Sequence, residues 1–270
     1  MEKLVNKIAS QIREIIGFDP EIAIILGSGL SEIADALENK VVLPYSELDG
    51  MLLTKVEGHK NQFVCGKLSG KKVIAMQGRF HLYDGFSPKQ VCLPIYIFKE
   101  LGVKTLIITN ASGGIADDLA AGDLMLISDH VNHTGQNALI GGPIIDYGVQ
   151  FVDMTEPYDI KYRKLAIEIA NQNKINLKQG TYMQFIGPFY ETKADIKMAK
   201  VLGANAVGMS TAVEVEAAVQ CKLKVLGLSL ITDKAAGLSK NKLTHEDVLR
   251  VAQNASNKMT TLIEEFVKRV

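Results

Sequence analysis

The sequence predicts an α/β fold, with a mixed, largely parallel β-sheet flanked by helices, and a single domain over residues 1–270. Two observations carry this prediction. Short, unbroken apolar runs recur along the chain, and such runs are typical of strands that are covered on both faces. Longer stretches with helical periodicity separate them, and this alternation is typical of a sheet between layers of helices. At 47% hydrophobic content, the 270 residues can bury a substantial core.

The expected elements follow the chain in order. The first is an amphipathic helical segment whose apolar face holds Leu4, Ile8, Ile12 and Ile15. Apolar runs then predict strands at 22–26, 72–76, 105–110, 123–128, 181–187, 206–209 and 225–232. Helical periodicity predicts helices at 88–101, 159–175, 192–202, 212–222 and 244–268.

Two connections are informative. Ser69 and Gly70 lie between two strand-like runs and predict a hairpin, so part of the sheet is expected to be antiparallel. Residues 132–158 have weak periodicity and many turn residues, so we expect a long functional loop there.

Charge and cysteine usage narrow the function. The 30 basic and 30 acidic residues cancel, so no overall field would draw the chain to nucleic acid or to an anionic membrane. No segment reaches the roughly 20 apolar residues that a membrane span needs. A small-molecule ligand is therefore favoured. Cys65, Cys92 and Cys221 are odd in number and far apart, which predicts buried, reduced thiols in the cytoplasm and no zinc site.

Polar or glycine-rich residues follow several of the expected strands, and ligands of open α/β sheets bind at the carboxyl ends of strands. Gly27, Ser28 and Gly29 would let backbone N–H groups approach an anion. Arg79 and His81 alternate along an extended segment, so both point to one side, as a phosphate clamp requires. Alone, the first motif also fits a packing turn and the second a solvated pair.

Two further strand ends add to this pattern. Asn110 ends a buried strand before residues 111–114, which are expected to form a loop with free amides, and Met209 and Ser210 follow another strand. A plain strand-to-helix turn and a core methionine are the alternative interpretations. Together the amides, guanidinium, imidazole and hydroxyl suit a bound oxyanion such as phosphate.

A second group of residues suits a flat heterocycle. Tyr190 could stack on its face, and Glu191 could accept hydrogen bonds from its ring N–H groups. Asp233, at the end of the strand 225–232, could reach the far edge of the same ring.

Seven motifs carry a family resemblance. "LGSGL", "EGHKNQFVCG", "MQGRFHLYDG", "TNASGGI", "GPFYETKAD", "GANAVGMSTAVEV" and "SLITD" resemble, in order and spacing, the purine nucleoside phosphorylases of the trimeric type. That group also includes xanthosine and 5'-methylthioadenosine phosphorylases. The match runs from about residue 20 to the end of the sequence. The resemblance implies reversible phosphorolysis, in which a purine nucleoside and inorganic phosphate give a free base and (deoxy)ribose 1-phosphate.

The resemblance also implies roles for residues at matching positions. The implied phosphate site is formed by Ser28, His59, Arg79, Phe80, His81, the backbone at Ala111, and Ser210. The implied nucleoside site is formed by Tyr83, Asn110, Phe151, Tyr190, Glu191, Met209, Asp233 and His245. The implied catalytic residues are Asp233, Glu191 and His81. Inorganic phosphate is a co-substrate, and no cofactor or metal ion is implied.

Some roles are more specific. Glu191 would bond the N1/N2 edge of the base, residue 233 would face N7 and the 6-substituent, and His245 would lie near the 5'-hydroxyl. Phe151 matches an aromatic residue that enters the ribose pocket of a neighbouring subunit, so a homotrimer is implied.

The remaining ionisable residues near the motifs have structural interpretations. Glu214, Glu216, His130 and His133 are expected to be structural, with His130 satisfying a local hydrogen bond, and Lys234 is expected to be solvated.

Asp233 departs from the family pattern, because members that act on 6-oxopurines usually have Asn there. An ionised Asp only accepts hydrogen bonds, so it would repel O6 and favour a 6-amino group, whereas a protonated Asp could donate to N7. Asp233 is thus expected to extend specificity toward 6-aminopurines. The methylthioadenosine branch would have a second acidic residue where Ala235 stands.

Other functions remain open at this point. They are a methylthioadenosine or xanthosine phosphorylase, a hydrolytic nucleosidase, and a purine-binding protein without catalysis. Phosphate dependence of base release would separate the phosphorylases from the other two.

Overall fold

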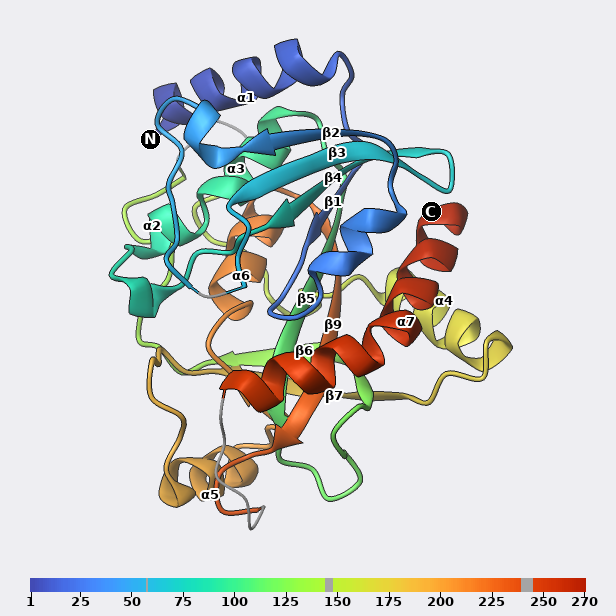
Figure 1. The fold of residues 1–270 in the computed structure, drawn as a ribbon. Coiled ribbons are helices and arrows are strands. Elements are labelled where there is room, and N and C mark those ends of the chain that lie inside the picture. The colour runs from blue at the N-terminus through green and yellow to red at the C-terminus, as the bar shows by residue number, and fades with distance from the viewer. Residues whose placement is uncertain (57, 144–147, 239–244) are drawn as a thin grey trace.

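The computed structural model describes residues 1–56, 58–143, 148–238 and 245–270, and at positions 245–249, 253 and 254 it describes the backbone alone. Figure 1 shows a central sheet with helices on both faces. Helix α1 (Glu2–Ile16) and the region of helix α5 (Lys193–Val201) lie at opposite ends of the molecule. Within the described ranges, none of the helices combines the length and the apolar composition that crossing a membrane requires.

The described strands form one sheet in the order β2-β3-β4-β1-β5-β8-β7-β6-β9, and β9 also pairs with β5. Their bounds are β1 (Ile22–Ile25), β2 (Glu38–Pro44), β3 (Gln62–Leu68), β4 (Lys71–Gln77), β5 (Thr105–Gly114), β6 (Leu124–Asn132), β7 (Leu177–Gln184), β8 (Ala206–Gly208) and β9 (Lys224–Lys234). Strand β1 is parallel to β4 and β5, β5 to β9, and β7 to β6 and β8. The pairs β2–β3, β3–β4, β5–β8 and β6–β9 are antiparallel. The predicted mixed α/β fold is confirmed.

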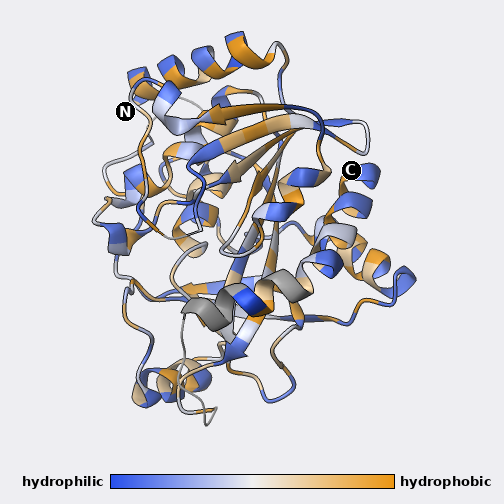
Figure 2. Ribbon diagram, in the orientation of Figure 1, coloured by the Kyte–Doolittle hydropathy of each residue, from blue (hydrophilic) through white to orange (hydrophobic). Residues whose placement is uncertain are grey.

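The helices cover two faces of this sheet. The other helices are α2 (Pro88–Val91), α3 (Leu93–Glu100), α4 (Ile160–Gln172), α6 (Ala212–Gln220) and α7 (His245–Arg269). Buried residues of α1, α3 and α6 pack with one face of the strands, and those of α4 and α7 pack with the other. Figure 2 shows the hydrophobic strands between these layers and an α1 with one apolar and one polar side.

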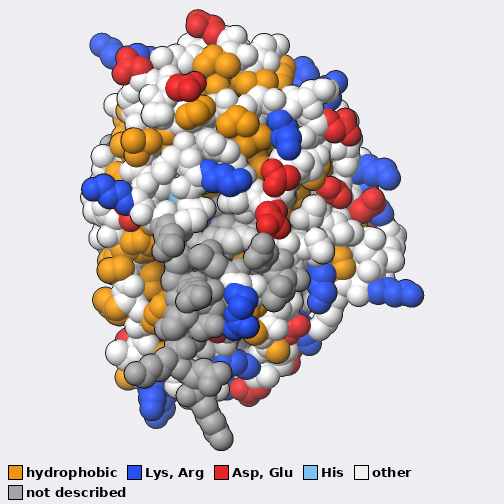
Figure 3. Space-filling model, viewed as in Figure 1, with side chains coloured by type: hydrophobic (Ala, Val, Ile, Leu, Met, Phe, Trp, Pro, Cys, Tyr) orange, Lys and Arg blue, Asp and Glu red, His pale blue; other side chains and the backbone are white. Residues whose placement is uncertain are grey.

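Charged residues on the face in Figure 3 are mixed, with Lys and Arg interspersed among Asp and Glu. This distribution agrees with the balanced charge of the chain.

Several elements differ from the sequence prediction. The apolar face of α1 includes the buried Ile16, whereas Ile15 is 49% exposed, so the expected face is wrong by one position at its end. The helix expected at 88–101 is interrupted at Cys92, where α2 ends and α3 begins. Pro94, in the first turn of α3, has no N–H to donate to the preceding turn, so a continuous helix is disfavoured. Strand β2 was not expected, because it begins with exposed polar residues and so lacks the apolar run that identified the other strands.

The expected hairpin is confirmed, whereas a function for the loop expected at 132–158 stays a prediction. Strands β3 and β4 form an antiparallel hairpin, and Ser69 and Gly70 take the positive φ values, 49° and 82°, that its tight turn requires. Between Asn132 and Ile160, the described residues contain neither helix nor strand. Helix α7 begins at His245, and position 244 lies outside the described residues.

Candidate active site

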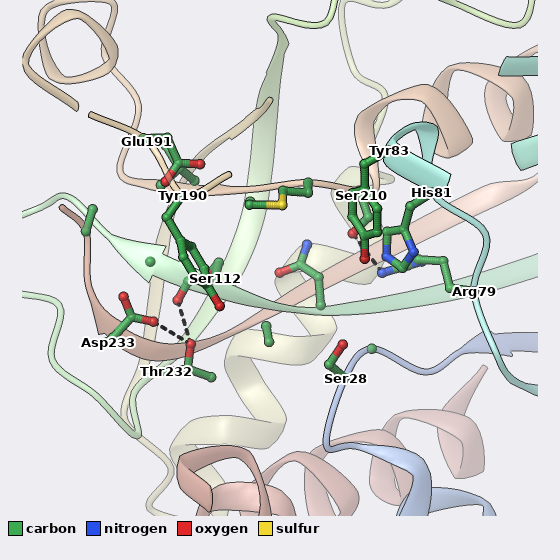
Figure 4. A pocket seen from close by; sticks show the side chains of 18 of the residues that line it. Ser28, Arg79, His81, Tyr83, Ser112, Tyr190, Glu191, Ser210, Thr232 and Asp233 are labelled. Atoms are coloured by element: carbon green, nitrogen blue, oxygen red, sulfur yellow. Dashed lines mark hydrogen bonds between the residues drawn. The ribbon is translucent and has the colours of Figure 1, made fainter. Parts of the chain in front are cut away.

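A pocket lies at the carboxyl ends of the parallel strands β1, β4, β5 and β9, beside the antiparallel strand β8. Its lining residues are Gly27, Ser28, His59, Arg79, His81, Tyr83, Asn110, Ala111, Ser112, Gly113, Tyr190, Glu191, Val207, Gly208, Met209, Ser210, Thr232, Asp233 and Ala235. Figure 4 shows its polar side chains in two groups, with Arg79, His81 and Ser210 at one end and Glu191 and Asp233 at the other. The tertiary structure thus brings together residues from most of the motifs.

Arg79 is the central charge of the first group, and it is only 1% exposed. Its Nε donates to Glu214 Oε1 at 3.1 Å, and its Nη1 donates to the Thr109 carbonyl at 2.9 Å and to Ser210 Oγ at 3.0 Å. Its Nη2 is buried and has no hydrogen-bond partner in the part of the chain that the structure describes. Since a buried cationic donor strongly prefers an acceptor, Nη2 is suited to bind an anion in the pocket.

His59 lies beside Arg79 with a defined proton position. Its Nδ1 is 3.1 Å from the Arg79 carbonyl oxygen, and because a carbonyl only accepts, Nδ1 carries the proton. Burial, with His81 and Arg79 nearby, lowers the pKa of His59 to about 3. The ring is therefore neutral near pH 7, and its buried Nε2, which bonds no described residue, is an acceptor. Such a nitrogen suits a phosphate oxygen that carries a proton.

His81 is held by the residues around it. Its ring stacks on Tyr83, with centroids 4.5 Å apart, and its Nδ1 is 3.7 Å from Asp84 Oδ2. Burial lowers the pKa of His81, and Asp84 partly opposes this effect. Burial would raise the pKa of Asp84, but the nearby His81 and a 3.1 Å hydrogen bond from Thr54 lower it. Asp84 therefore faces His81, a contact that sequence reasoning missed, although His81 Nδ1 makes no hydrogen bond to the described residues.

The Ser28 loop lies directly against β5. The Gly27 N–H donates to Thr109 Oγ1 at 3.0 Å, and a Cβ at Gly27 would come within 2.7 Å of Asn110 Cα. Only glycine therefore permits this approach, which puts Ser28 in the pocket.

The loop expected at residues 111–114 is wrong, because β5 continues to Gly114. Gly113 and Gly114 pair with Val207 and Ala206 of β8, a contact between distant segments that the local sequence does not signal. Ala111 still lines the pocket from within the strand.

The second group contains two carboxyl groups. Glu191, which follows β7, is 7% exposed, and burial raises its pKa, with the nearby Asp233 adding to the effect. Burial also raises the pKa of Tyr190, and both carboxylates contribute. Thr232 Oγ1 lies 2.8 Å from Asp233 Oδ1, to which it can donate. This end of the pocket can therefore accept hydrogen bonds from a ring that lies against Tyr190.

Three expected site residues are not among those that line the pocket. Phe80 is fully buried and packs on Tyr45 and Phe86, so a phosphate contact there would come from its backbone. Phe151 is 88% exposed. The side chain of His245 lies outside the described residues. The roles of Phe80, Phe151 and His245 stay predictions.

Glu214 has the structural role expected of it, but its contact with Arg79 was missed. Its Oε2 accepts from the Thr211 N–H at 2.9 Å at the start of α6. The spacing of Thr211 and Glu214 is that of a capping box, a signal that could have identified the buried carboxylate.

The structure also tests the expectations for His130 and Lys234. His130 Nδ1 lies 3.1 Å from the Tyr158 hydroxyl, which confirms the local hydrogen bond. Lys234 is partly exposed, as expected, but its Nζ also donates to the Ala116 carbonyl at 2.7 Å and the Asp117 carbonyl at 3.3 Å. Those carbonyls belong to a distant turn that only the fold brings near.

Metal-ligating side chains do not cluster in the described ranges, where no group of three or more His, Cys, Asp or Glu could hold a metal ion. The expectation that the reaction needs no metal stays a prediction.

Comparisons with known proteins agree with this geometry. Residues 21–268 match the family described as the Phosphorylase superfamily. Purine nucleoside phosphorylase 1 of Geobacillus stearothermophilus is 41% identical over 266 residues, which are 98% of this chain and 97% of that protein.

Solved structures of Schistosoma mansoni purine nucleoside phosphorylase are similar throughout. The complex with adenosine has a TM-score of 0.94 and 36% identity, and the match covers 99% of this chain and 97% of that one. The complex with inosine has a TM-score of 0.94 and 37% identity, with 99% and 96% covered.

Proposed function

Because the chain belongs to the purine nucleoside phosphorylases of the Phosphorylase superfamily, we propose that it cleaves purine ribo- and deoxyribonucleosides with inorganic phosphate to give the free base and the pentose 1-phosphate. The observation that carries this proposal is the buried Arg79, which lines the pocket opposite Glu191 and Asp233 and whose Nη2 bonds none of the described residues. That all described strands belong to one sheet supports a single phosphorylase domain over residues 1–270.

Phosphate would occupy the end of the pocket with Arg79. Ser28, His59, His81 and Ser210 supply polar groups there, and β5 contributes its backbone at Ala111. Arg79 Nη2 would donate to one phosphate oxygen, while His59 Nε2 would accept the proton of a monohydrogen phosphate. Asp84 would keep His81 oriented toward the same anion.

The nucleoside would lie between the two ends of the pocket. Breaking the N-glycosidic bond builds positive charge on the sugar and negative charge on the departing base. A phosphate anion held at the Arg79 end would stabilise the first charge, and a donor at N7 of the base, which Asp233 would supply with a protonated carboxyl group whose other oxygen still accepts, would stabilise the second. The sugar would contact Tyr83, Met209 and Asn110. His245 is predicted to lie at its 5'-hydroxyl.

The base would lie against Tyr190, with Glu191 and Asp233 at two of its edges. We assign Asp233 the selection of the 6-substituent, because a carboxylate accepts from a 6-amino group and repels a 6-oxo group. The S. mansoni relative has been solved with adenosine as well as with inosine, so the shared fold accommodates both kinds of base.

A homotrimer belongs to the same proposal. Phe151 is 88% exposed in the single chain, which supports a role in a neighbouring subunit's ribose pocket. A cytoplasmic location stays a prediction, and the three buried cysteines without disulfides support it.

The experiment that tests the reaction is base release from inosine, guanosine and adenosine, with and without inorganic phosphate. We expect turnover only with phosphate, together with formation of ribose 1-phosphate. Equal release without phosphate would indicate a hydrolytic nucleosidase, and purine binding without turnover would indicate a non-catalytic protein.

A further inference from the structure

A chain of buried polar side chains runs beneath the pocket from Ser112 to Ser210. Ser112 Oγ is 2.7 Å from Ser229 Oγ, Ser229 Oγ donates to Asn110 Oδ1, and Asn110 Nδ2 donates to Thr211 Oγ1 at 2.9 Å. Thr211 Oγ1 is in turn 3.2 Å from Ser210 Oγ. All five residues are at most 8% exposed, and Ser229 and Thr211 are fully buried.

Counting the hydroxyl protons shows in which direction the hydrogen bonds from Ser112 to Ser210 are donated. Each hydroxyl has one proton, and that of Ser229 is committed to Asn110 Oδ1, so Ser112 is the donor in its contact with Ser229. At the other end, Thr211 Oγ1 already accepts from Asn110, so its own proton is directed to Ser210 Oγ. The reverse order would require the Asn110 amide to be turned over, with Thr211 donating to Asn110 Oδ1 and Ser112 donating to the Leu230 carbonyl 3.5 Å away, so the orientation of the Asn110 amide selects the direction.

The hydroxyl of Ser210 is thereby left with only its proton to donate. Its Oγ accepts from Thr211 and from Arg79 Nη1, the latter at 3.0 Å, which occupies both lone pairs. Its proton therefore points into the pocket that Ser210 lines. Hydrogen bonds that donate in one direction strengthen one another in a buried site, so the Ser210 hydroxyl becomes a better donor.

The backbone of Thr211 supports the same interpretation. Its φ is 88°, a conformation that is strained for a β-branched residue. Glu214 Oε2 holds it by accepting the Thr211 N–H at 2.9 Å. This strained conformation puts Oγ1 between Asn110 and Ser210, where the chain needs it.

We propose that Ser229, which does not line the pocket, is a positioning residue that fixes the Asn110 amide and thereby makes Ser210 a hydrogen-bond donor to the bound phosphate. The inference rests on the proposed function, because it needs phosphate at the Arg79 end. Without the Ser229 hydroxyl, Asn110 Oδ1 loses its donor, the amide is free to turn over, and the direction of the chain is lost.

The test is Ser229→Ala, measured as the KM for phosphate and the KM for nucleoside in the full-length enzyme. We expect the phosphate KM to rise about five- to tenfold, the range for losing one buried hydrogen bond, and the nucleoside KM, which depends on Asn110 through the sugar, to rise less than the phosphate KM. The matched control is Thr105→Val, which removes a buried hydroxyl at the opposite end of β5, where Thr105 Oγ1 contacts the Tyr162 hydroxyl at 2.7 Å. This variant should leave the phosphate KM unchanged.

A double-mutant cycle distinguishes positioning from a structural effect. In a Ser210→Ala background, Ser229→Ala should add less than about twofold to the phosphate KM, because both changes remove the same donor. Additive effects, or no effect of Ser229→Ala alone, would overturn the proposal.

A second pair of variants keeps the test independent of how well Ser229→Ala folds. Thr211→Val removes the hydroxyl in the middle of the chain and should raise the phosphate KM, whereas Thr211→Ser keeps the hydroxyl and should recover most of the affinity. Equal phosphate KM values for these two variants would contradict the proposal. If the wild type needs no phosphate for turnover, it is the proposed function that fails.

Discussion

Arg79 and Glu214 form a buried ion pair in which Nε and Oε1 are 3.1 Å apart and both side chains are 2% exposed. The second oxygen of the same carboxylate accepts from the Thr211 N–H. Glu214 therefore connects the N-terminus of α6 to the guanidinium that carries the proposed phosphate site.

Glu214→Gln should destabilise the protein, because it leaves the charge of Arg79 buried without a counter-ion. We expect the free energy of unfolding to fall by about 3 kcal/mol or more, measured by urea denaturation. The matched control is Glu216→Gln on the same helix. Burial raises the pKa of Glu216, and its Oε1 accepts from Asn132 at 2.8 Å, a bond that Gln can also accept, so the change should stay within about 1 kcal/mol. Similar losses in both variants would contradict the importance of the ion pair.

Asp233→Asn should shift base preference toward 6-oxopurines, since an amide can donate to O6 or N7 where a carboxylate only accepts. We expect the ratio of kcat/KM for adenosine to that for inosine to fall about tenfold or more. If the wild type does not act on adenosine and the substitution leaves the ratio unchanged, the role assigned to Asp233 is wrong.

Glu191→Gln should lower kcat/KM for purine nucleosides about 100-fold and change its pH dependence. Burial raises the pKa of Glu191, so one of its oxygens takes up a proton, and becomes a donor instead of an acceptor, at a higher pH than in an exposed Glu. The wild-type kcat/KM should therefore fall as the pH is lowered through that raised pKa, and the fall should be weaker in Glu191→Gln. Parallel pH profiles for the two proteins would refute this assignment.

His130→Gln should make the protein less sensitive to acid. Burial lowers the pKa of His130 to about 4, whereas in the unfolded chain it is near the ordinary 6.5. Between these values the unfolded state binds a proton that the folded state does not, so stability decreases as the pH falls from about 6.5 to 4, by up to about 3 kcal/mol for this residue. Urea denaturation at pH 7 and pH 4.5 measures the difference. A wild type and variant that lose the same stability over this range would rule out His130 as a source.

Phe151→Ala should lower activity without removing any side chain that lines the pocket of its own subunit. We expect mixed oligomers with Glu191→Ala subunits to be more active than the average of the two parents, because a Phe151→Ala subunit keeps Glu191 and receives Phe151 from a neighbour. Light scattering should give the mass of a trimer. Full activity of Phe151→Ala, or mixtures that match the average, would exclude this contribution.

Much of the fold could be predicted because the central strands are unbroken apolar runs. Strands β1 and β4 are buried on both faces, and their positions followed from their own residues. The extension of β5 to Gly114 could not be predicted, because its partners in β8 and β9 are about a hundred residues away.

The sequence predicted which residues line the pocket, but it did not predict the contacts between them and their neighbours. Arg79, His81, Glu191 and Asp233 were identified from motifs, and all four line the pocket. The sequence did not indicate that Asp84 faces His81 or that Glu214 holds Arg79, because these contacts depend on how the segments pack.

By itself, the sequence determined which polar groups follow which strands, since apolar runs and turn residues act over a few neighbouring positions. Only the tertiary structure decided that Ser229 bonds Asn110, that Thr211 reaches Ser210, and that Arg79 Nη2 bonds none of the residues the structure describes. The physical reason is that a buried polar group must find its partner in space, and its partners here come from strands and helices far apart in the chain.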